Sequence, residues 1–458
     1  MKVLTLTLAL LGLAGCGYHL LDRPSVENPV PSPQAWKSAS IGHSGQISGG
    51  WLKSFNEPRL EALVDQAIAN NHDLAVAAAR MREAREGAIG QRALLLPTLD
   101  TSASGSVSDI RNATGRENYR LSLNAAWEID LWGRLRKLSR AGSNTAFAAA
   151  EDFRDARLSL AASTARAYYN LVAANRQMAL AEEILESFEA NLRIIERNYK
   201  GTGEGALDIQ FGRNNVASAK RALESRKLAR SEAARSLELL LGEYPSASAH
   251  SGLKLPDLSA SVPSGLPVQL LERRPDLRAA RARLLASANR ADGARLNLLP
   301  SISINGSSSN TTGDFSQLLD MDALVSSLSS NLSQPLFQGG ELQAQARAAL
   351  ERNRAEIHRY AQAVLEAFRE VESALEADRS LARQKIYLEE QLKQAVLAER
   401  QSERDYTEGV NLNILSVLEA QRRANNARAS MISLLNERIR NRIDLHLALG
   451  GDFNTLGP

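Results

Sequence analysis

The sequence predicts a mainly α-helical protein with a smaller β part, made of two copies of one structural unit. Three observations predict this fold class: a long apolar seam at heptad spacing, short runs in which polar and apolar residues alternate, and motifs that recur at a nearly constant offset. Only 5% of the 458 residues are aromatic and the formal net charge is +3. This composition suits long helices and predicts no polyanionic partner such as nucleic acid.

The first segment, residues 1–15, has the pattern of a bacterial secretion signal. Its apolar run from Val3 to Leu13 has about eleven residues, which is too few to span a bilayer. Cys16 is the only cysteine and directly follows two small residues, as in a bacterial lipobox. We expect Cys16 to become the mature N-terminus with S-diacylglycerol and N-acyl groups; the alternative is an ordinary signal peptide with an incidental cysteine.

The residues after Cys16 predict how the chain is anchored. Gly17 stands where an Asp would retain a lipoprotein at the inner membrane, which favours the outer membrane. Residues 16–50 contain several prolines and predict a lipid-anchored, extended tether.

Alternating polar and apolar residues predict four strands, at about 98–109, 119–131, 301–310 and 324–336. Strands of this length can cross a bilayer when tilted. Strands in lipid must close into a barrel, because an open edge leaves backbone groups unpaired, and the smallest common barrels need about eight strands. The chain would therefore pool its strands with copies of itself. The alternative is two small soluble hairpins that cap a helical bundle.

Three acidic residues fall on the polar face of the first strand pair: Asp100, Glu128 and Asp130. We interpret this face as the lining of a watery lumen. The acidic residues would either bias the pore towards cations or simply solvate it.

A long helix is predicted at about 134–200. No Pro or Gly interrupts the chain between Phe153 and Lys200, and at about 1.5 Å per residue the helix would be about 100 Å long. Its apolar seam keeps heptad spacing and consists of Phe153, Ala156, Leu160, Thr164, Ala167, Leu171, Ala174, Met178, Ala181, Leu185, Phe188, Leu192, Ile195 and Tyr199. The second half repeats this seam with Asp378, Lys385, Glu399 and Ser402 among its members. We therefore expect the second long helix, at about 341–407, to be held less tightly.

The duplication sets the domain boundaries. Asn71-His72-Asp73-Leu74 is echoed by Arg274-Pro275-Asp276-Leu277, and Leu95-Leu96-Pro97 by Leu298-Leu299-Pro300, both 203 positions later (73 to 276, 97 to 300). We place the first repeat at 51–242, a Pro-rich linker at 243–267, the second repeat at 268–451 and a tail at 452–458.

Together these features resemble the TolC-type outer-membrane factors, in the lipoprotein branch that serves resistance-nodulation-division efflux pumps. The residues that carry the likeness are Cys16, Trp127 to Leu135, Glu272 to Leu277, Leu299 to Ile302, Gln334 to Phe337 and Leu418 to Gln421. The resemblance implies a homotrimer in which twelve strands form a barrel in outer-membrane lipid and the helices form a coiled-coil tunnel in the periplasm. It also implies two partners, a periplasmic adaptor protein and an inner-membrane efflux pump.

In this family the periplasmic end of the tunnel is closed by two helix turns that open when the partners engage. The gate residues that the resemblance implies are Tyr199, Gly203, Asp208, Tyr406, Gly409, Asn411 and Glu419. Glu419 stands where the family pattern has Asp, and Asn411 stands near the position of a gating Arg in some relatives.

No motif predicts catalysis. The six histidines are scattered without metal-ligand spacing, and there is no convincing nucleophile, phosphate-loop or zinc pattern. We expect no enzyme activity, no metal and no cofactor other than the covalent lipid. The leading interpretation is a passive exit duct in the outer membrane. The alternatives are a lipid-anchored periplasmic coiled-coil scaffold without a pore and, last, a lipoprotein enzyme.

Overall fold

The computed structural model describes residues 30–38, 50–108, 116–202, 206–256, 258, 262, 265, 267–408 and 414–451. The chain divides into two compact units. Among the described residues, the sheet unit comprises residues 30–31 with those of 78–152 and 276–364, and the hairpin unit comprises those of 32–77, 153–275 and 365–451. The predictions for residues 1–15, Cys16, Gly203, Gly409, Asn411 and the tail 452–458 lie outside the described residues.

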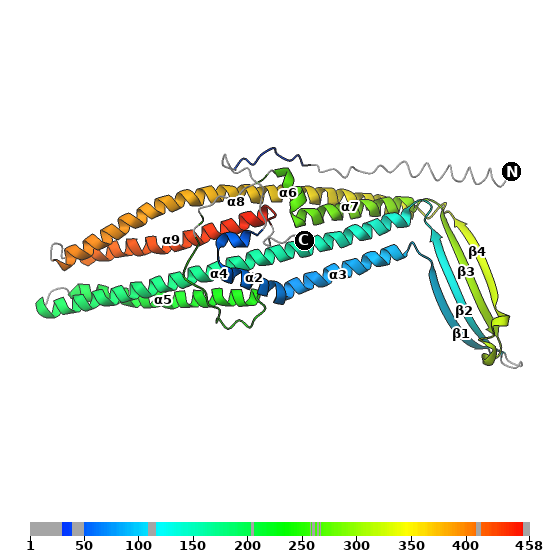
Figure 1. Cartoon of the computed structure of the whole chain (residues 1–458), viewed down its shortest axis with the longest axis horizontal. Helices are drawn as coiled ribbons and strands as arrows, with labels where there is room; N and C mark the ends of the chain where they lie inside the picture. The colour runs from blue at the N-terminus through cyan, green and yellow to red at the C-terminus, as the bar shows by residue number, and fades with distance from the viewer. Residues whose placement is uncertain are drawn as a thin grey trace. The chain divides into compact units, whose positions relative to one another are not determined.

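Four antiparallel strands form one sheet: β1 (Thr98–Ser108), β2 (Arg116–Ile129), β3 (Ser301–Thr312) and β4 (Val325–Ser333). They lie in the order β1-β2-β3-β4, so pairing of β2 with β3 joins the two halves of the duplication (Figure 1). The strands and their predicted ranges differ by at most three residues at either end. A difference of three residues occurs at the start of β2, which begins at Arg116 rather than at 119, and at the end of β4. Strand β4 ends at Ser333 rather than at 336 because Pro335 has no N–H to donate.

The register gives the sheet one apolar and one polar face. Paired residues in an antiparallel sheet project to the same side, and the apolar pairs include Leu99 with Ala125, Trp127 with Ile304, and Ile302 with Leu332. Large apolar side chains stay uncovered within the chain, with Leu99 68% and Leu328 80% exposed. Among the described residues, strands β1 and β4 are the edges of the sheet, each paired on one side only.

The four longest helices account for a little under half of the chain. Helix α4 (Arg134–Thr202) has 69 residues and α8 (Glu341–Thr407) has 67. Each is followed by a 35-residue helix, α5 (Ala206–Leu240) or α9 (Ile414–Ala448), which lies beside it (Figure 1). Within the described residues, no helix combines the length and apolar character needed to cross a membrane.

The predicted seam of α4 is buried in the hairpin unit. Thr164 and Leu171 have no exposed surface, and Ile195 is 4% exposed, whereas Tyr199 at the end of the seam is 38% exposed. The core packed against this seam includes Leu237 of α5 and Ile443 of α9. The heptad spacing therefore identified the side of α4 on which the core forms.

The shorter helices are η1 (Trp51–Phe55), α2 (Pro58–Asn70), α3 (His72–Ala93), α6 (Pro267–Arg273), α7 (Pro275–Leu296), η2 (Phe315–Gln317) and η3 (Met321–Ala323). The residue before α3 contacts the end of α5, and the residue before α7 contacts the end of α9. Asn71 Nδ2 donates to the carbonyl oxygen of Leu240 at 3.1 Å, and Arg274 Nη1 donates to that of Ala448 at 3.2 Å. Equivalent positions of the two repeats thus make the same contact with different side chains.

The last helix of each repeat ends at a glycine with positive φ. Gly242 follows α5 at φ +72°, and Gly450 follows α9 at φ +68°. A Cβ atom at Gly242 would lie 2.6 Å from the carbonyl oxygen of Asn70, and one at Gly450 would lie 3.2 Å from the carbonyl carbon of Arg273. Backbone conformation and close approach both require glycine at these helix ends.

The linker after α5 is fixed to the hairpin unit by Glu238, which is 1% exposed. Its carboxylate accepts hydrogen bonds from the N–H groups of Ala247 and Ala249, both at 2.8 Å. Burial opposes ionisation, but the backbone hydrogen bonds outweigh it and lower the pKa of Glu238 below its usual value.

Part of the predicted tether is packed rather than free. Trp36 is 6% exposed and lies edge-to-face against Phe368, with ring centroids 5.9 Å apart. The N–H groups of Lys37 and Ser38 donate to the two carboxylate oxygens of Glu372, each at 2.8 Å. The prolines led us to expect an extended, unpacked segment, and for residues 36–38 this expectation is wrong, because an aromatic side chain and a carboxylate hold them on α8.

Candidate channel and gate residues

The polar face of the sheet carries Asp100 and Glu128 of the predicted acidic set. The register places Asp100 opposite Asn124 and Glu128 opposite Ser303. Hydroxyl groups bond across the strands on the same face, as in the 2.8 Å contact between Ser102 and Ser122. Such a face is well suited to water, whereas the opposite face is suited to an apolar surrounding.

Glu128 and Asp130 are engaged by the first turn of α4. Arg134 Nη2 donates to both oxygens of Glu128 at 2.7 Å. Asp130 accepts from the backbone N–H groups of Leu135 and Arg136, both at 2.9 Å, and from Arg136 Nε at 3.1 Å. Asp130 therefore caps α4, and arginines balance both charges.

Of the predicted acidic set, Asp100 alone forms no ion pair within the part of the chain that the structure describes. Sequence reasoning found these carboxylates but not their arginine partners, because Arg134 and Arg136 lie beyond the alternating pattern.

The ends of the two helical hairpins pack against each other. Ile195 of α4 forms an apolar cluster with Ile414 and Val417 of α9, and each of the three is at most 4% exposed. Tyr406 of α8 and Ile209 of α5 pack against this cluster. We call these residues the tip cluster. It joins the two turns in which the gate residues were predicted.

Polar side chains continue the tip cluster along the helices. Asn191 Nδ2 of α4 donates to Gln421 Oε1 of α9 at 3.0 Å, and Gln421 Nε2 donates to Glu403 of α8 at 2.8 Å. Gln421 is 1% exposed. Gln421 belongs to the motif Leu418 to Gln421, but its role was not predicted from the sequence. A glutamine in a helix fits a surface position as well as a buried hydrogen bond, so its residue type alone did not indicate burial.

The described gate residues differ in their surroundings. Tyr406 is half-buried in the tip cluster, Tyr199 is exposed, and Asp208 lies in the first turn of α5, where its charge suits the helix dipole. Glu419 pairs with Arg422 and Arg423 of its own helix, and these hydrogen bonds lower its pKa to about 2. Glu419 is therefore ionised throughout the physiological range.

The polar residues of the second seam have partners. Glu399 is 9% exposed and its carboxylate pairs with Arg428 of α9 at 2.5 and 3.0 Å. Asp378 lies 3.5 Å from Arg442 Nη2 of the same helix. These pairs compensate burial of the charges, and the looser packing of the second seam stays a prediction.

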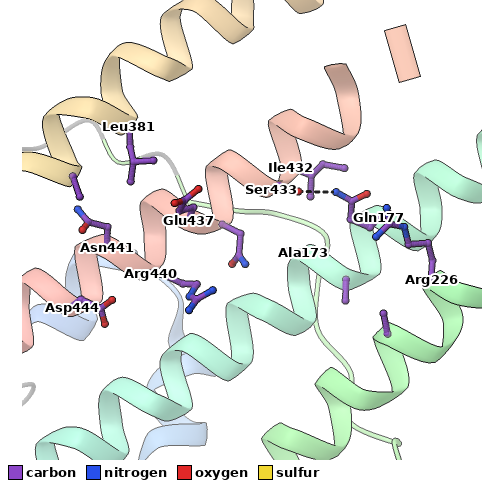
Figure 2. A pocket seen from close by; sticks show the side chains of 14 residues that line it. Ala173, Gln177, Arg226, Leu381, Ile432, Ser433, Glu437, Arg440, Asn441 and Asp444 are labelled. Atoms are coloured by element: carbon purple, nitrogen blue, oxygen red, sulfur yellow. Dashed lines mark hydrogen bonds between the residues drawn. The ribbon is translucent and has the colours of Figure 1, made fainter. Parts of the chain in front are cut away.

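A groove of about 540 Å³ runs between α4, α5, α8 and α9 in the hairpin unit (Figure 2). Gln177 of α4 reaches across it, donating to the carbonyl oxygen of Ala429 at 2.8 Å and lying 3.4 Å from Ser433 Oγ. Its charged lining residues are Arg226, Glu437, Arg440 and Asp444. Charges of both signs make this a solvated groove, and no group of three or more metal-binding side chains is found among the described residues.

An amphipathic four-stranded sheet with two open edges, together with long paired helices, defines an architecture of membrane channels that extend into water. A family model described as outer membrane efflux protein matches residues 63–243 and 266–451. The chain belongs to the outer membrane efflux protein family, and the double match confirms its duplication.

Relatives with assigned names agree with this family. The chain is 30% identical over 447 residues to the pyoverdine export outer membrane protein OpmQ of Pseudomonas putida, covering 94% of each chain. It is 29% identical over 455 residues to the cation efflux system protein CusC of Escherichia coli, covering 96% of each. Among solved structures, the open state of the MtrE outer membrane channel of Neisseria gonorrhoeae superimposes with a TM-score of 0.85 at 28% identity, covering 95% of this chain and 100% of that one. The recognition from sequence motifs and the outer-membrane location are confirmed.

Proposed function

We propose that this chain forms, with two further copies, the passive exit duct of a tripartite efflux system in the outer membrane. The observation that carries the proposal is the sheet, which has one apolar face exposed to its surroundings and one polar face. The duct performs no catalysis; its partners supply the energy for transport.

Association of several copies follows from the edges of the sheet. Strands β1 and β4 each have an unpaired edge within the chain, and such edges are costly in lipid because every backbone group there needs an internal partner. Four strands are too few to close a barrel, since the smallest common barrels have about eight. Pairing of β1 with β4 of a neighbouring copy removes every edge, and three copies, the number that the family resemblance implies, supply twelve strands.

The hairpin ends are the proposed gate. The tip cluster holds the α4–α5 turn to the α8–α9 turn through Ile195, Val417 and Tyr406. A periplasmic adaptor and an inner-membrane pump that separate these turns would open the duct. The residues assigned to the turns, including Gly203, Gly409 and Asn411, take part in this gate by family resemblance.

Lipid on Cys16 is part of the proposal. The lipobox pattern supports S-diacylglycerol and N-acyl groups at this residue. Labelling with radioactive palmitate is expected for the wild type and lost in Cys16→Ser. Equal labelling of both proteins would contradict lipidation at this site.

The cargo is set by the partners rather than by the duct. Relatives of comparable identity are named for pyoverdine export and for cation efflux, so similar chains serve different systems. The polar face of this sheet is rich in serine, which offers little discrimination between solutes.

Single-channel recording in planar bilayers tests the proposal. The purified full-length protein is expected to give discrete conductance steps. A coiled-coil scaffold without a pore would leave the current at baseline, and this result would overturn the proposed function.

A further inference from the structure

A groove of about 460 Å³ in the sheet unit is lined by arginines from two helices. Arg283 and Arg290 come from α7, and Arg352 and Arg359 come from α8; the one acidic residue of the lining is Glu356. In each helix the two arginines are seven residues apart, which is about two turns, so they project to the same side. The groove therefore has a row of guanidinium groups along each flank.

The carboxylates nearby balance only part of this charge. Arg283 pairs with Asp152, and Arg359 pairs with Glu356. Arg290 donates to the hydroxyl of Thr145 at 2.8 Å, a neutral partner. Arg352 has no ion pair or hydrogen bond within the described part of the chain. Two of the four guanidinium charges, those of Arg290 and Arg352, therefore lack a carboxylate partner.

Between the arginines the groove is lined by small residues. Ala286, Ser287 and Ala349 are lining residues that are at most 8% exposed. Small side chains leave room for a solute to come close to both flanks. The volume of about 460 Å³ exceeds that of a single water molecule, about 30 Å³, by more than tenfold.

The groove is linked to the polar strand face along α4. On α4, Thr145 and Asp152 follow Arg134 by about three and about five helical turns, so all three residues share one helix face. Arg134 bonds Glu128, which belongs to the polar face of β2. One face of α4 therefore carries residues that contact the arginines of the groove and a residue that bonds the polar strand face.

We propose that this groove binds compact multivalent oxyanions, carrying phosphate or carboxylate groups, on their way through the duct. Guanidinium groups bind such oxygens through two parallel hydrogen bonds, and two flanking rows match an anion with charge at both ends. The inference rests on the proposed function, since the polar face lines a conduit only when the copies close a barrel. It is opposite to the cation bias that was one of the two interpretations of the acidic strand residues, and two of those residues are neutralised by arginine.

Equilibrium dialysis of the full-length protein in detergent against radiolabelled pyrophosphate tests the site, with citrate as a second probe. The test variant is Arg290→Gln/Arg352→Gln. A matched control is Arg347→Gln/Arg354→Gln, which removes two charges seven residues apart from the opposite side of α8; Arg354 pairs with Glu351 outside the groove. Circular dichroism and gel filtration establish that both variants fold.

Wild type and control are expected to bind pyrophosphate equally. Loss of one unit charge about 4 Å from an anion in water-like surroundings changes the affinity about fivefold, so the test variant should bind more than tenfold more weakly. Arg290→Lys/Arg352→Lys keeps both charges and should recover part of this loss. Binding of citrate as well supports the wider class of oxyanions, and binding of pyrophosphate alone supports the site for phosphates.

Two results would overturn the site: no binding to the wild type, or equal binding to the wild type and Arg290→Gln/Arg352→Gln. Conductance of the same wild-type preparation separates this outcome from failure of the proposed function. Conductance steps without pyrophosphate binding overturn the site alone, whereas pyrophosphate binding without conductance overturns the duct and with it the role of the groove in passage.

Discussion

Replacing Ile195 by Ala removes the central side chain of the tip cluster. Ile195 is 4% exposed and packs against Ile414 and Val417 of the other hairpin. Truncation of a buried Ile to Ala costs about 2 to 4 kcal/mol, from lost burial and the cavity left behind. The cluster is the apolar contact between the two hairpin ends, so most of this loss should favour their separation. A loss of about 2 kcal/mol raises the equilibrium constant for local opening about 30-fold.

Hydrogen–deuterium exchange of the purified protein measures this opening. Peptides from the end of α4 and the start of α9 should exchange about 30-fold faster in Ile195→Ala. The neighbouring Ile194 is 37% exposed and outside the cluster, so Ile194→Ala is a matched control with an expected effect within about 0.5 kcal/mol. If both variants exchange at the same rate, the tip cluster does not hold the hairpin ends together.

Three further predictions concern the hairpin unit. Gly242→Ala and Gly450→Ala should each lose at least about 1 kcal/mol of stability in thermal unfolding because of their positive φ, with Gly242→Ala the worse, since its Cβ would meet a carbonyl oxygen at 2.6 Å; equal losses would contradict this. Burial and, second, the nearby Arg442 lower the pKa of His446 to about 4 from 6.5. The free energy of unfolding should therefore be highest above pH 6.5, where His446 is neutral in both the folded and the unfolded state, and should fall by about 2 kcal/mol between pH 8 and pH 5, because the unfolded state then binds a proton more readily. The variant His446→Phe should not show this pH dependence. Glu372→Gln keeps one acceptor for two N–H donors, so residues 36–38 should become sensitive to protease, whereas unchanged cleavage would mean that Trp36 alone holds them.

Regular patterns in the sequence predicted the regular parts of the fold. The heptad seam from Phe153 to Tyr199 identified the buried side of α4, because a coiled-coil partner imposes its period on the apolar residues. Alternation located four strands with one apolar face, because the pleat has a period of two. Both patterns depend only on residues close together in the sequence, so a single sequence was sufficient to recognise them.

Contacts between distant segments were not predictable in this way. The bond from Gln421 to Glu403 and the packing of Trp36 on Phe368 depend on which helices become neighbours. Likewise, the arginines of α7 and α8 look like ordinary surface residues until the fold places Arg290 and Arg352 along one groove. Sequence reasoning identified the acidic residue Glu128 but missed its partner Arg134, six residues later, since the bend between strand and helix brings them together.

The central claim is that the edge strands β1 and β4 pair with other copies of the chain. Hydrogen–deuterium exchange of the protein in lipid vesicles tests it directly. Because pairing removes every free edge, β1 and β4 are predicted to exchange as slowly as the inner strands β2 and β3. Rapid exchange of β1 and β4 beside protected β2 and β3 would mean that the sheet keeps open edges and would contradict the pooled barrel.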